Sequence, residues 1–161
     1  VYLDPQNPSL LGIENAGRIS TVQLIDGEFP NVDKLYAGSY PIHVVINKQA
    51  LLDAIKRVSL VAERNAPIRM VFAGQELTLS AGAADEASAN EILDVDLDGE
   101  DITVAFNPNY LREGLSAIAE PFVRMKMTTA IKPVEFNGQQ EADSEESLAY
   151  RYLLVPMRFG N

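Results

Sequence analysis

His43 is the only histidine in the sequence, and histidine is the side chain that most often serves as a general base at neutral pH. It stands in an apolar run without a serine or cysteine nucleophile motif around it, which favours a structural or surface role. The sequence also contains no G-x-S-x-G, no phosphate-binding glycine loop and no H-E-x-x-H. We therefore expect a protein that is not an enzyme and that uses no cofactor.

The stretch "DVDLDGE", residues 94–100, has the pattern that begins a calcium-binding loop, with acids at positions 1, 3 and 5 and glycine at position 6. A complete loop would carry a bidentate glutamate at position 12, where this chain has Ala105. The acids also alternate with Val95 and Leu97, which is the periodicity of a strand. We therefore predict no metal site here, but a strand with an acidic face that ends at an Asp98–Gly99 hairpin turn.

Basic residues gather in one predicted helix, although the whole chain has a formal net charge of −10. They are Lys48, Lys56, Arg57 and Arg64, and their acidic neighbours in this helix are Asp53 and Glu63. One interpretation is a solvated face with ion pairs between successive turns. The other is a local basic surface that meets phosphates without reading bases. Periodicity alone does not choose between them, while the negative total argues against a general nucleic-acid coat.

The end of the chain, "YRYLLVPMRFGN", is apolar and contains a proline. Pro156 has no N–H for a sheet ladder, so it belongs at a strand end or an edge. The adaptable Met157 beside it favours a groove that binds a partner. The alternative is a C-terminal strand that completes the core, and the pattern leaves both interpretations open.

The composition permits one ordinary domain, or one domain with a fragment of another. The chain has 161 residues, of which 47% are hydrophobic, so a sizeable core is expected. It lacks an apolar run of about 18 residues, the length that spans a membrane. It also lacks cysteine, which suits a reducing compartment.

The first elements are a predicted hairpin and a connector. Residues 9–25 are predicted to form two apolar strands joined by a turn at Asn15-Ala16-Gly17. Residues 26–40 are dense in Gly, Pro, Asn and Asp, so we interpret them as a connector into a second unit.

A pattern then occurs twice. "HVVINKQALLDAI" (43–55) is similar to "TVAFNPNYLREGL" (103–115), and "IRMVF" (68–72) is similar to "VRMKM" (123–127). Each copy has a short apolar strand, an asparagine suited to cap a helix, and leucines at helical spacing. The repeat predicts an α+β fold of two β-α-β-β-β halves, with two helices packed on antiparallel sheets.

The repeat also sets the expected bounds of the elements. One helix is predicted from Lys48 to about Arg64 and the other from Pro108 to about Ala119, after the caps Asn47 and Asn107. The predicted inward residues are Leu51, Ala54, Ile55, Val58, Val61 and Ala62 in the first helix, and Leu111, Leu115 and Ile118 in the second. Strands are predicted at 69–74, 76–82, 91–99, 101–106, 122–129, 133–138 and 150–157. Residues 139–149 are predicted to form an acidic, mobile hairpin loop.

Several motifs occur in the order found in a known family. The repeat, "DGEFPN", "NEILDV", "FNPNYL" and "YLLVPMRF" together resemble the bacterial replicative sliding clamp, the β subunit of DNA polymerase III. The resemblance covers nearly the whole chain. It implies that residues 1–38 are the end of the clamp's middle domain with the interdomain linker, and that 39–161 are its C-terminal domain.

The resemblance implies a non-catalytic processivity factor. In this family a homodimer of three-domain chains closes a ring around double-stranded DNA, with helices lining the hole. Lys48, Lys56, Arg57 and Arg112 then become candidates for the DNA-facing surface, and Ser59 and Leu60 for the ring interface. A chain of this length would lack parts of the ring contact, so we expect that it does not close a ring alone.

The resemblance also implies a hydrophobic pocket that binds short linear motifs of the polymerase III alpha subunit, the clamp loader, other polymerases and repair proteins. The residues carried over are Pro30, Lys34, Leu35, Asn107, Tyr110, Ile131, Pro133, Leu153, Leu154, Val155, Pro156, Met157 and Arg158. It further implies a cytoplasmic location and no membrane partner. Without the resemblance, the alternative is a β-rich peptide- or protein-binding module unrelated to DNA.

Overall fold

The computed structural model of the chain describes residues 1–161 except 4, 7–8, 30, 62–65, 82–88 and 159–161. It contains two compact units, Val1–Val32 (unit 1) and Asp33–Asn161 (unit 2). The division falls earlier in the chain than the domain boundary expected at residue 38. Both helices in the described part of the chain are too short or too polar to cross a bilayer.

Unit 1 is an antiparallel sheet of three strands, β1 (Tyr2–Leu3), β2 (Leu10–Asn15) and β3 (Arg18–Gln23), in the order β1-β2-β3. Ala16 and Gly17 join β2 to β3 with φ angles of 47° and 77°. Two successive positive φ angles give the turn whose twist matches a two-residue hairpin. The hairpin predicted at this turn is therefore confirmed.

Unit 2 contains the predicted repeat. After the 3₁₀ turn η1 (Val32–Leu35), the first half consists of β4 (Ile42–Asn47), α1 (Lys48–Val58), β5 (Ile68–Ala73), β6 (Glu76–Ala81) and β7 (Ala89–Asp94). The second consists of β9 (Ile102–Phe106), α2 (Pro108–Ala117), β10 (Phe122–Met127), β11 (Val134–Gln139) and β12 (Glu146–Leu154). The short strand β8 (Asp96–Asp98) lies between them. The prediction of two β-α-β-β-β halves is confirmed.

The two halves exchange their first strands. One sheet has the order β12-β11-β10-β4-β8, so β4 of the first half joins three strands of the second. The other sheet has the order β7-β6-β5-β9, so β9 of the second half joins three strands of the first. Both exchanged strands pair antiparallel, β4 with β10 and β9 with β5. Neither half can therefore complete its sheet without the other.

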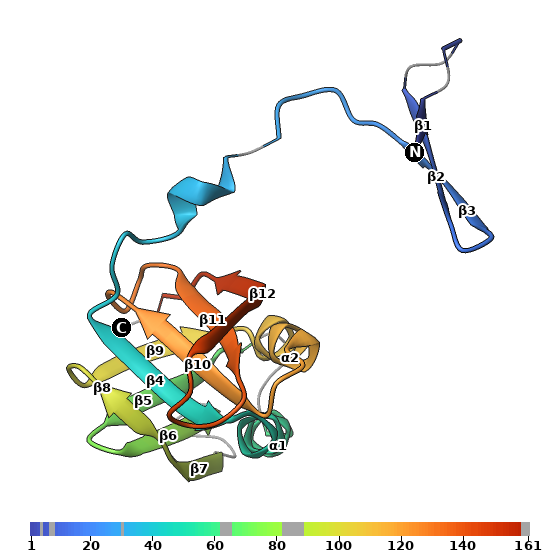
Figure 1. The fold of residues 1–161 in the computed structure, drawn as a ribbon. Helices are drawn as coiled ribbons and strands as arrows, with labels where there is room; N and C mark the ends of the chain where they lie inside the picture. Colours follow the sequence, from blue (N-terminus) through green and yellow to red (C-terminus); the bar gives the residue numbers. More distant parts are fainter. Residues whose placement is uncertain (4, 7–8, 30, 62–65, 82–88, 159–161) are drawn as a thin grey trace. The chain divides into compact units, whose positions relative to one another are not determined.

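The core lies between the sheets and the two helices. The helices lie side by side in Figure 1 and contact each other. Its largest buried side chains include Phe72, Phe106 and Phe136, and the rings of Phe106 and Phe136 meet edge to face at 5.9 Å. All three predicted inward residues of α2 are buried, as are Leu51, Ala54, Ile55 and Val58 of α1. Each fully buried side chain of this size contributes roughly 1.5–3 kcal/mol.

Both helices begin where their asparagine caps predict. The Asn47 side-chain oxygen accepts from the Ala50 N–H at 3.0 Å. The Asn107 side-chain oxygen accepts from the N–H groups of Asn109 and Tyr110 at 2.9 and 3.4 Å. Each cap satisfies backbone donors that the first helical turn leaves without partners.

The predicted end of the first helix at about Arg64 is wrong, because α1 ends at Val58. Beyond Val58, the Ser59 N–H still bonds four residues back, to the Ile55 carbonyl at 3.0 Å, and the Ser59 hydroxyl donates to the same carbonyl at 2.5 Å. The next N–H groups, of Leu60 and Val61, bond three residues back rather than four, which tightens the last turn. Val61 is half-buried beyond the helix, and Ala62 and Arg64 lie outside the described residues.

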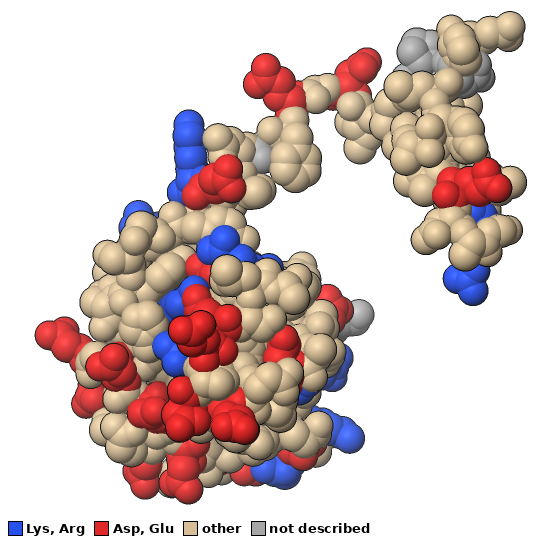
Figure 2. All heavy atoms as spheres, viewed as in Figure 1, with Lys and Arg blue, Asp and Glu red and all other residues tan. Residues whose placement is uncertain are grey.

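The single strand predicted over 91–99 is also wrong, because this stretch forms β7 and β8 in different sheets. Gln75 bonds to the chain between β7 and β8. Its side-chain amide bonds both the N–H and the carbonyl of Leu97, and its backbone carbonyl accepts from the Val95 N–H. Asp98–Gly99 then leads to the other sheet and is not a hairpin turn. Gly99 has φ 123°, and a Cβ there would lie 2.6 Å from the Pro41 carbonyl oxygen. Figure 2 shows acidic side chains gathered where Figure 1 draws β7 and β8.

The acidic loop predicted over 139–149 is shorter than expected. Gln139 is the buried last residue of β11, and β12 begins at Glu146. The Gln139 side-chain amide donates to the carbonyls of Glu141 and Ala142, both at 2.8 Å, and so closes a tight turn. These side-chain bonds allow the strands to extend into the acidic stretch.

Gly114 supplies the first testable prediction. Alanine ordinarily stabilises a helix relative to glycine by about 1 kcal/mol. A Cβ on Gly114, however, would collide with the ring of Tyr152, which packs on α2. Gly114→Ala should therefore lower the free energy of unfolding by about 1–3 kcal/mol.

Chemical denaturation measures this effect, with Gly38→Ala as the control because a Cβ there meets no atom within 4 Å. The control should change stability by less than about 1 kcal/mol. Equal stabilities of the two variants would contradict the packing of Tyr152 on α2.

Candidate functional site

The C-terminal tail leaves one sheet and reaches the other. β12 ends at Leu154, which is buried, and Val155 is 62% exposed. Beyond Pro156, the Met157 N–H donates to the Ala105 carbonyl of β9 at 2.7 Å. β9 is an edge strand of the four-stranded sheet, so the described part of the tail, which ends at Arg158, connects the two sheets through this backbone bond. The interpretation as a strand that completes the core holds for Leu154, whereas the residues after it leave the ladder and their role in binding a partner stays a prediction.

The first half of the repeat contains a counterpart of this tail. There, β7 continues through Val95 into β8, which pairs with β4 at three positions and closes the edge of the five-stranded sheet. β4 and β9 are equivalent first strands, as β7 and β12 are equivalent last strands. Pro156 lacks the N–H that a strand like β8 would donate. The tail thus occupies the place equivalent to β8; in it Val155 and Arg158 are exposed, Met157 is half-buried and Pro156 is buried.

A hollow of about 400 Å³ lies in unit 2, where the linker passes the β10–β11 connection. Its lining residues are Lys34, Leu35, Tyr36, Ala37, Thr128, Lys132 and Pro133. Three of these, Lys34, Leu35 and Pro133, belong to the pocket predicted from sequence, and the structure brings them together. Ile131, from the same connection, is exposed. Pro30 lies outside the described residues.

The hollow and the tail form parts of one strip along the sheet edge. Pro133 precedes Val134, which pairs with Leu154 at the end of β12. Leu153 pairs with Glu135 beside it. The tail then bonds to Ala105, two residues before the helix cap Asn107. The β10–β11 connection, the end of β12 and the strand before α2 are thus neighbours in the fold, although the predicted pocket residues that they carry do not share one hollow.

Asn107 and Tyr110 lie at the start of α2, and each already uses one of its polar groups in a hydrogen bond within the fold. The Asn107 oxygen caps the helix, so only its amide nitrogen is left to orient a ligand. The Tyr110 carbonyl accepts from the Tyr152 hydroxyl at 3.1 Å, while the Tyr110 side chain is exposed. Arg158 is exposed at the end of the described tail.

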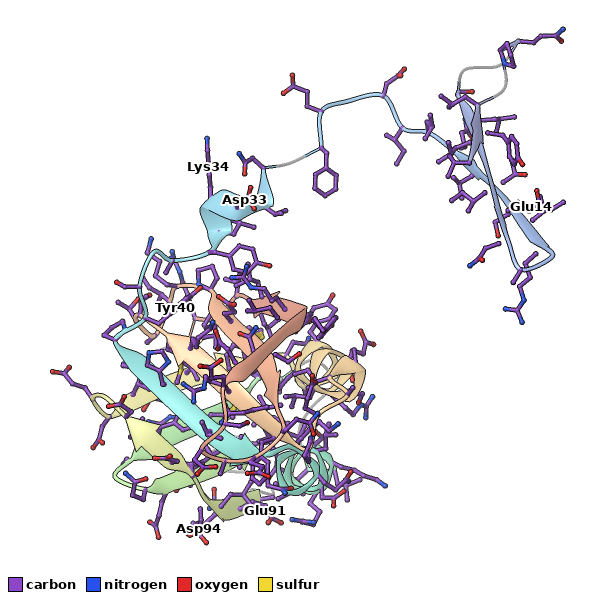
Figure 3. All side chains as sticks on the ribbon, viewed as in Figure 1. Glu14, Asp33, Lys34, Tyr40, Glu91 and Asp94 are labelled. Atoms are coloured by element: carbon purple, nitrogen blue, oxygen red, sulfur yellow. The ribbon has the colours of Figure 1, made fainter. Side chains whose placement is uncertain are left out.

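Behind the hollow lies a polar cluster that the sequence did not predict, called here the Glu135 network. Its members are Tyr40, Lys126, Glu135, Glu146 and Arg151. Glu135 is fully buried, and its carboxylate accepts from the Tyr40 hydroxyl and the Arg151 Nε, each at 2.7 Å. The Lys126 ammonium lies 3.1 Å from Glu135 and 2.7 Å from Glu146. Figure 3 labels Tyr40 below the linker residues Asp33 and Lys34.

These contacts decide the charge of Glu135. Burial alone would raise its pKa, but the hydrogen bonds from Arg151, Tyr40 and Lys126 outweigh burial and hold the pKa below the ordinary value of a glutamate. Burial and the bond to this carboxylate raise the pKa of Tyr40. The network therefore contains an ionised carboxylate that depends on donors from three segments of the chain.

The four predicted DNA-facing residues differ in whether their charged groups already have partners within the fold. The Lys48 ammonium donates to the Ile118 carbonyl at the end of α2, at 2.7 Å. Arg57 forms a two-point ion pair with Glu91 of β7, at 2.6 and 3.0 Å. Lys56 and Arg112 are exposed, and no ion pair holds either of them in the described part of the chain. Sequence reasoning missed Glu91, because its pairing depends on how β7 passes α1.

The predicted ring-interface residues lie just beyond α1. The Ser59 hydroxyl donates to the Ile55 carbonyl, whereas Leu60 is 81% exposed. Strand β7, which carries the exposed Ile92, forms an edge of its sheet. An apolar side chain beside an unpaired strand edge is a surface suited to association.

The Glu135 network predicts a stability that depends on pH. A carboxyl whose pKa is lowered by folding stabilises the fold above its unfolded pKa, and this contribution is lost as the pH falls through the folded pKa. Glu135→Gln should therefore lower the unfolding free energy by about 1–3 kcal/mol at neutral pH, and by less at about pH 3. Denaturant titrations at both values measure the difference.

Glu145→Gln is the matched control, because Glu145 is exposed in the neighbouring turn. It should change stability by less than about 0.5 kcal/mol at either pH. A loss for Glu135→Gln that does not shrink in acid would contradict the ionised state assigned to this carboxyl.

Comparisons with known proteins agree with this geometry. The family described as "DNA polymerase III beta subunit, C-terminal domain" matches residues 39–152. The beta sliding clamp of Streptomyces coelicolor is 42% identical over 149 residues, covering 92% of this chain and 40% of that protein. The "Beta sliding clamp homolog GriR" of Streptomyces muensis is 34% identical over 94% of this chain and 40% of its own length.

Solved structures show the same fold. The putative DNA polymerase III beta subunit of Eubacterium rectale superimposes with a TM-score of 0.80 at 28% identity, covering 95% of this chain and 40% of that one. A clamp from Pseudomonas aeruginosa bound to griselimycin has a TM-score of 0.81 at 23% identity and the same coverages, which shows likeness of fold. The chain thus spans about two-fifths of the length of the curated relatives that it matches. It belongs to the family of the DNA polymerase III beta subunit, the beta sliding clamp.

Proposed function

We propose that this chain acts as the C-terminal part of a replicative sliding clamp in the cytoplasm. As part of a homodimeric ring it would encircle duplex DNA and tether the replicative polymerase without catalysing a reaction. Residues 1–38 would supply the end of the middle domain and the linker, and 39–161 the last domain. The observation that carries this proposal is the strip formed by the tail, the start of α2 and the linker hollow, on a chain of this family.

The strip would capture short linear motifs of the polymerase III alpha subunit, the clamp loader, other polymerases and repair proteins. Exposed Val155 and half-buried Met157 offer apolar contacts, and a flexible methionine adapts to different anchors. Unused polar groups, such as the Asn107 amide, would orient the peptide. A site of this size supports affinities on the order of micromolar. Griselimycin, which is bound to a Pseudomonas aeruginosa clamp, is a second ligand to test.

The peptide proposal predicts the effect of a charge in the tail. Met157→Asp should weaken binding of a synthetic clamp-binding peptide of the replicative polymerase, the peptide probe, at least tenfold. The reason is that an apolar contact would be replaced by a carboxylate that must lose its water. Isothermal titration with the 161-residue chain measures this.

Leu148→Asp is the control, because Leu148 is an exposed leucine of β12 outside the strip. This variant should bind like the unchanged protein. If Met157→Asp binds the probe with unchanged affinity, the groove assignment is refuted.

The DNA-facing proposal rests on two exposed basic side chains of the helices. Lys56 and Arg112 point their charges to solvent, but Glu91 already binds Arg57, and the Arg57 hydrogen bond lowers the pKa of Glu91. Such a surface would attract phosphates weakly and without base contacts, as sliding requires. Leu60 and the edge of β7 would form one side of the ring contact.

In a full-length clamp that carries this chain as its C-terminal part, Lys56→Glu should shorten retention on DNA. The logarithm of the DNA affinity falls linearly with the logarithm of the salt concentration, and the substitution should reduce this slope by about one unit. Loss of clamp from nicked circular DNA at several salt concentrations measures both quantities. Arg57→Glu should have an effect at least as large, because it changes the local charge by the same amount and also releases Glu91 from its ion pair.

Lys132→Glu provides the control, since Lys132 lines the linker hollow rather than a helix face. Equal salt slopes for Lys56→Glu and Lys132→Glu would remove the helix face from the DNA-binding surface.

A further inference from the structure

We propose that Tyr40 is a positioning residue that, with Glu135 and Arg151, fastens the linker to the sheet and so preforms the linker wall of the peptide site. This inference rests on the peptide-binding function proposed above, and it assigns a task to residues outside the predicted pocket. It also implies that the wall exists before any peptide arrives.

The contacts run from the buried carboxylate to the wall itself. Tyr36 and Ala37 line the hollow. The Tyr40 hydroxyl donates to Glu135 at 2.7 Å and accepts from the Ala37 N–H at 3.1 Å. The Arg151 guanidinium binds the same carboxylate and lies 3.8 Å from the centre of the Tyr36 ring. One carboxylate therefore fixes two neighbouring residues of the wall by two separate routes.

The burial of Glu135 makes this arrangement rigid. A carboxylate without solvent contact is stable only while donors surround it, so each donor is held in place by the cost of losing it. Lys126 adds a third donor and lies 5.4 Å from the centre of the Tyr40 ring. The other two linker residues that line the hollow, Lys34 and Leu35, are exposed.

A preformed wall reduces the entropy lost when a peptide binds. If the wall detaches for part of the time, the apparent affinity falls by the fraction of molecules in which it is attached. Removing the Tyr40 hydroxyl deletes the bond to Ala37 and one of the bonds to Glu135, while the ring stays in place. We expect Tyr40→Phe to weaken binding of the peptide probe roughly threefold to tenfold.

The test uses the 161-residue chain, isothermal titration with the peptide probe, and amide hydrogen exchange. Tyr2→Phe is the matched control, because it also removes a hydroxyl that donates to a glutamate, Glu14 at 3.3 Å, but in unit 1. Tyr40→Phe should weaken binding and accelerate exchange at Ala37, whereas exchange in the β10 core stays slow. Tyr2→Phe should match the unchanged protein in both measurements.

Arg151→Lys is a second variant that keeps a positive charge near Glu135 but removes the planar group over Tyr36. It should also weaken binding of the probe and loosen residues 36–37. Unchanged Ala37 exchange in Tyr40→Phe would overturn the inference whether or not the probe binds. Failure of the unchanged protein to bind the probe, with exchange altered as expected, would instead refute the proposed peptide function and leave the fastening intact.

Discussion

The exchange of first strands between the two halves is the constraint on which the rest of unit 2 depends. β4 pairs with β10 at six positions and β9 with β5 at five, so each sheet is built from both halves. These ladders bring two distant parts of the chain into each sheet and leave the helices on a shared core. They also set the two junctions, β7–β8 and β12 with its tail, at which the chain passes between the sheets. The candidate site lies at the second junction.

Local signals in the sequence predicted the elements well. The caps Asn47 and Asn107 and the turn at Gly17 depend on neighbours within a few residues, and the structure has all three. The internal repeat, which relates segments far apart in the chain, is present as well. The sequence failed where distant contacts decide. Gln75 divides the stretch 91–99 between two sheets through bonds to Leu97, 22 residues away. The end of α1 at Val58 is a local feature that the pattern also missed.

The candidate site shows the same limit. Its apolar residues could be named through the family resemblance, because motifs such as "YLLVPMRF" are contiguous. Neither the Glu135 network nor the Arg57–Glu91 pair has such a signal: Tyr40 and Glu135 are far apart in the chain, and a charged residue in a strand ordinarily indicates a solvated face. Only the packing of the linker against β11 and β12 makes Glu135 a buried acceptor.

Pro156 has a consequence for how such a protein could acquire a binding site at all. A fold built from a repeat contains each junction between its sheets twice, and one copy of the junction is enough to hold the sheets together. Here the junction at β8 is closed by strand pairing, while in the described part of the tail the equivalent junction has the backbone bond from Met157. Pro156 cannot donate to a ladder, so the edge of β9 lacks a counterpart of β8 among the described residues, and the proposed peptide site lies at this edge.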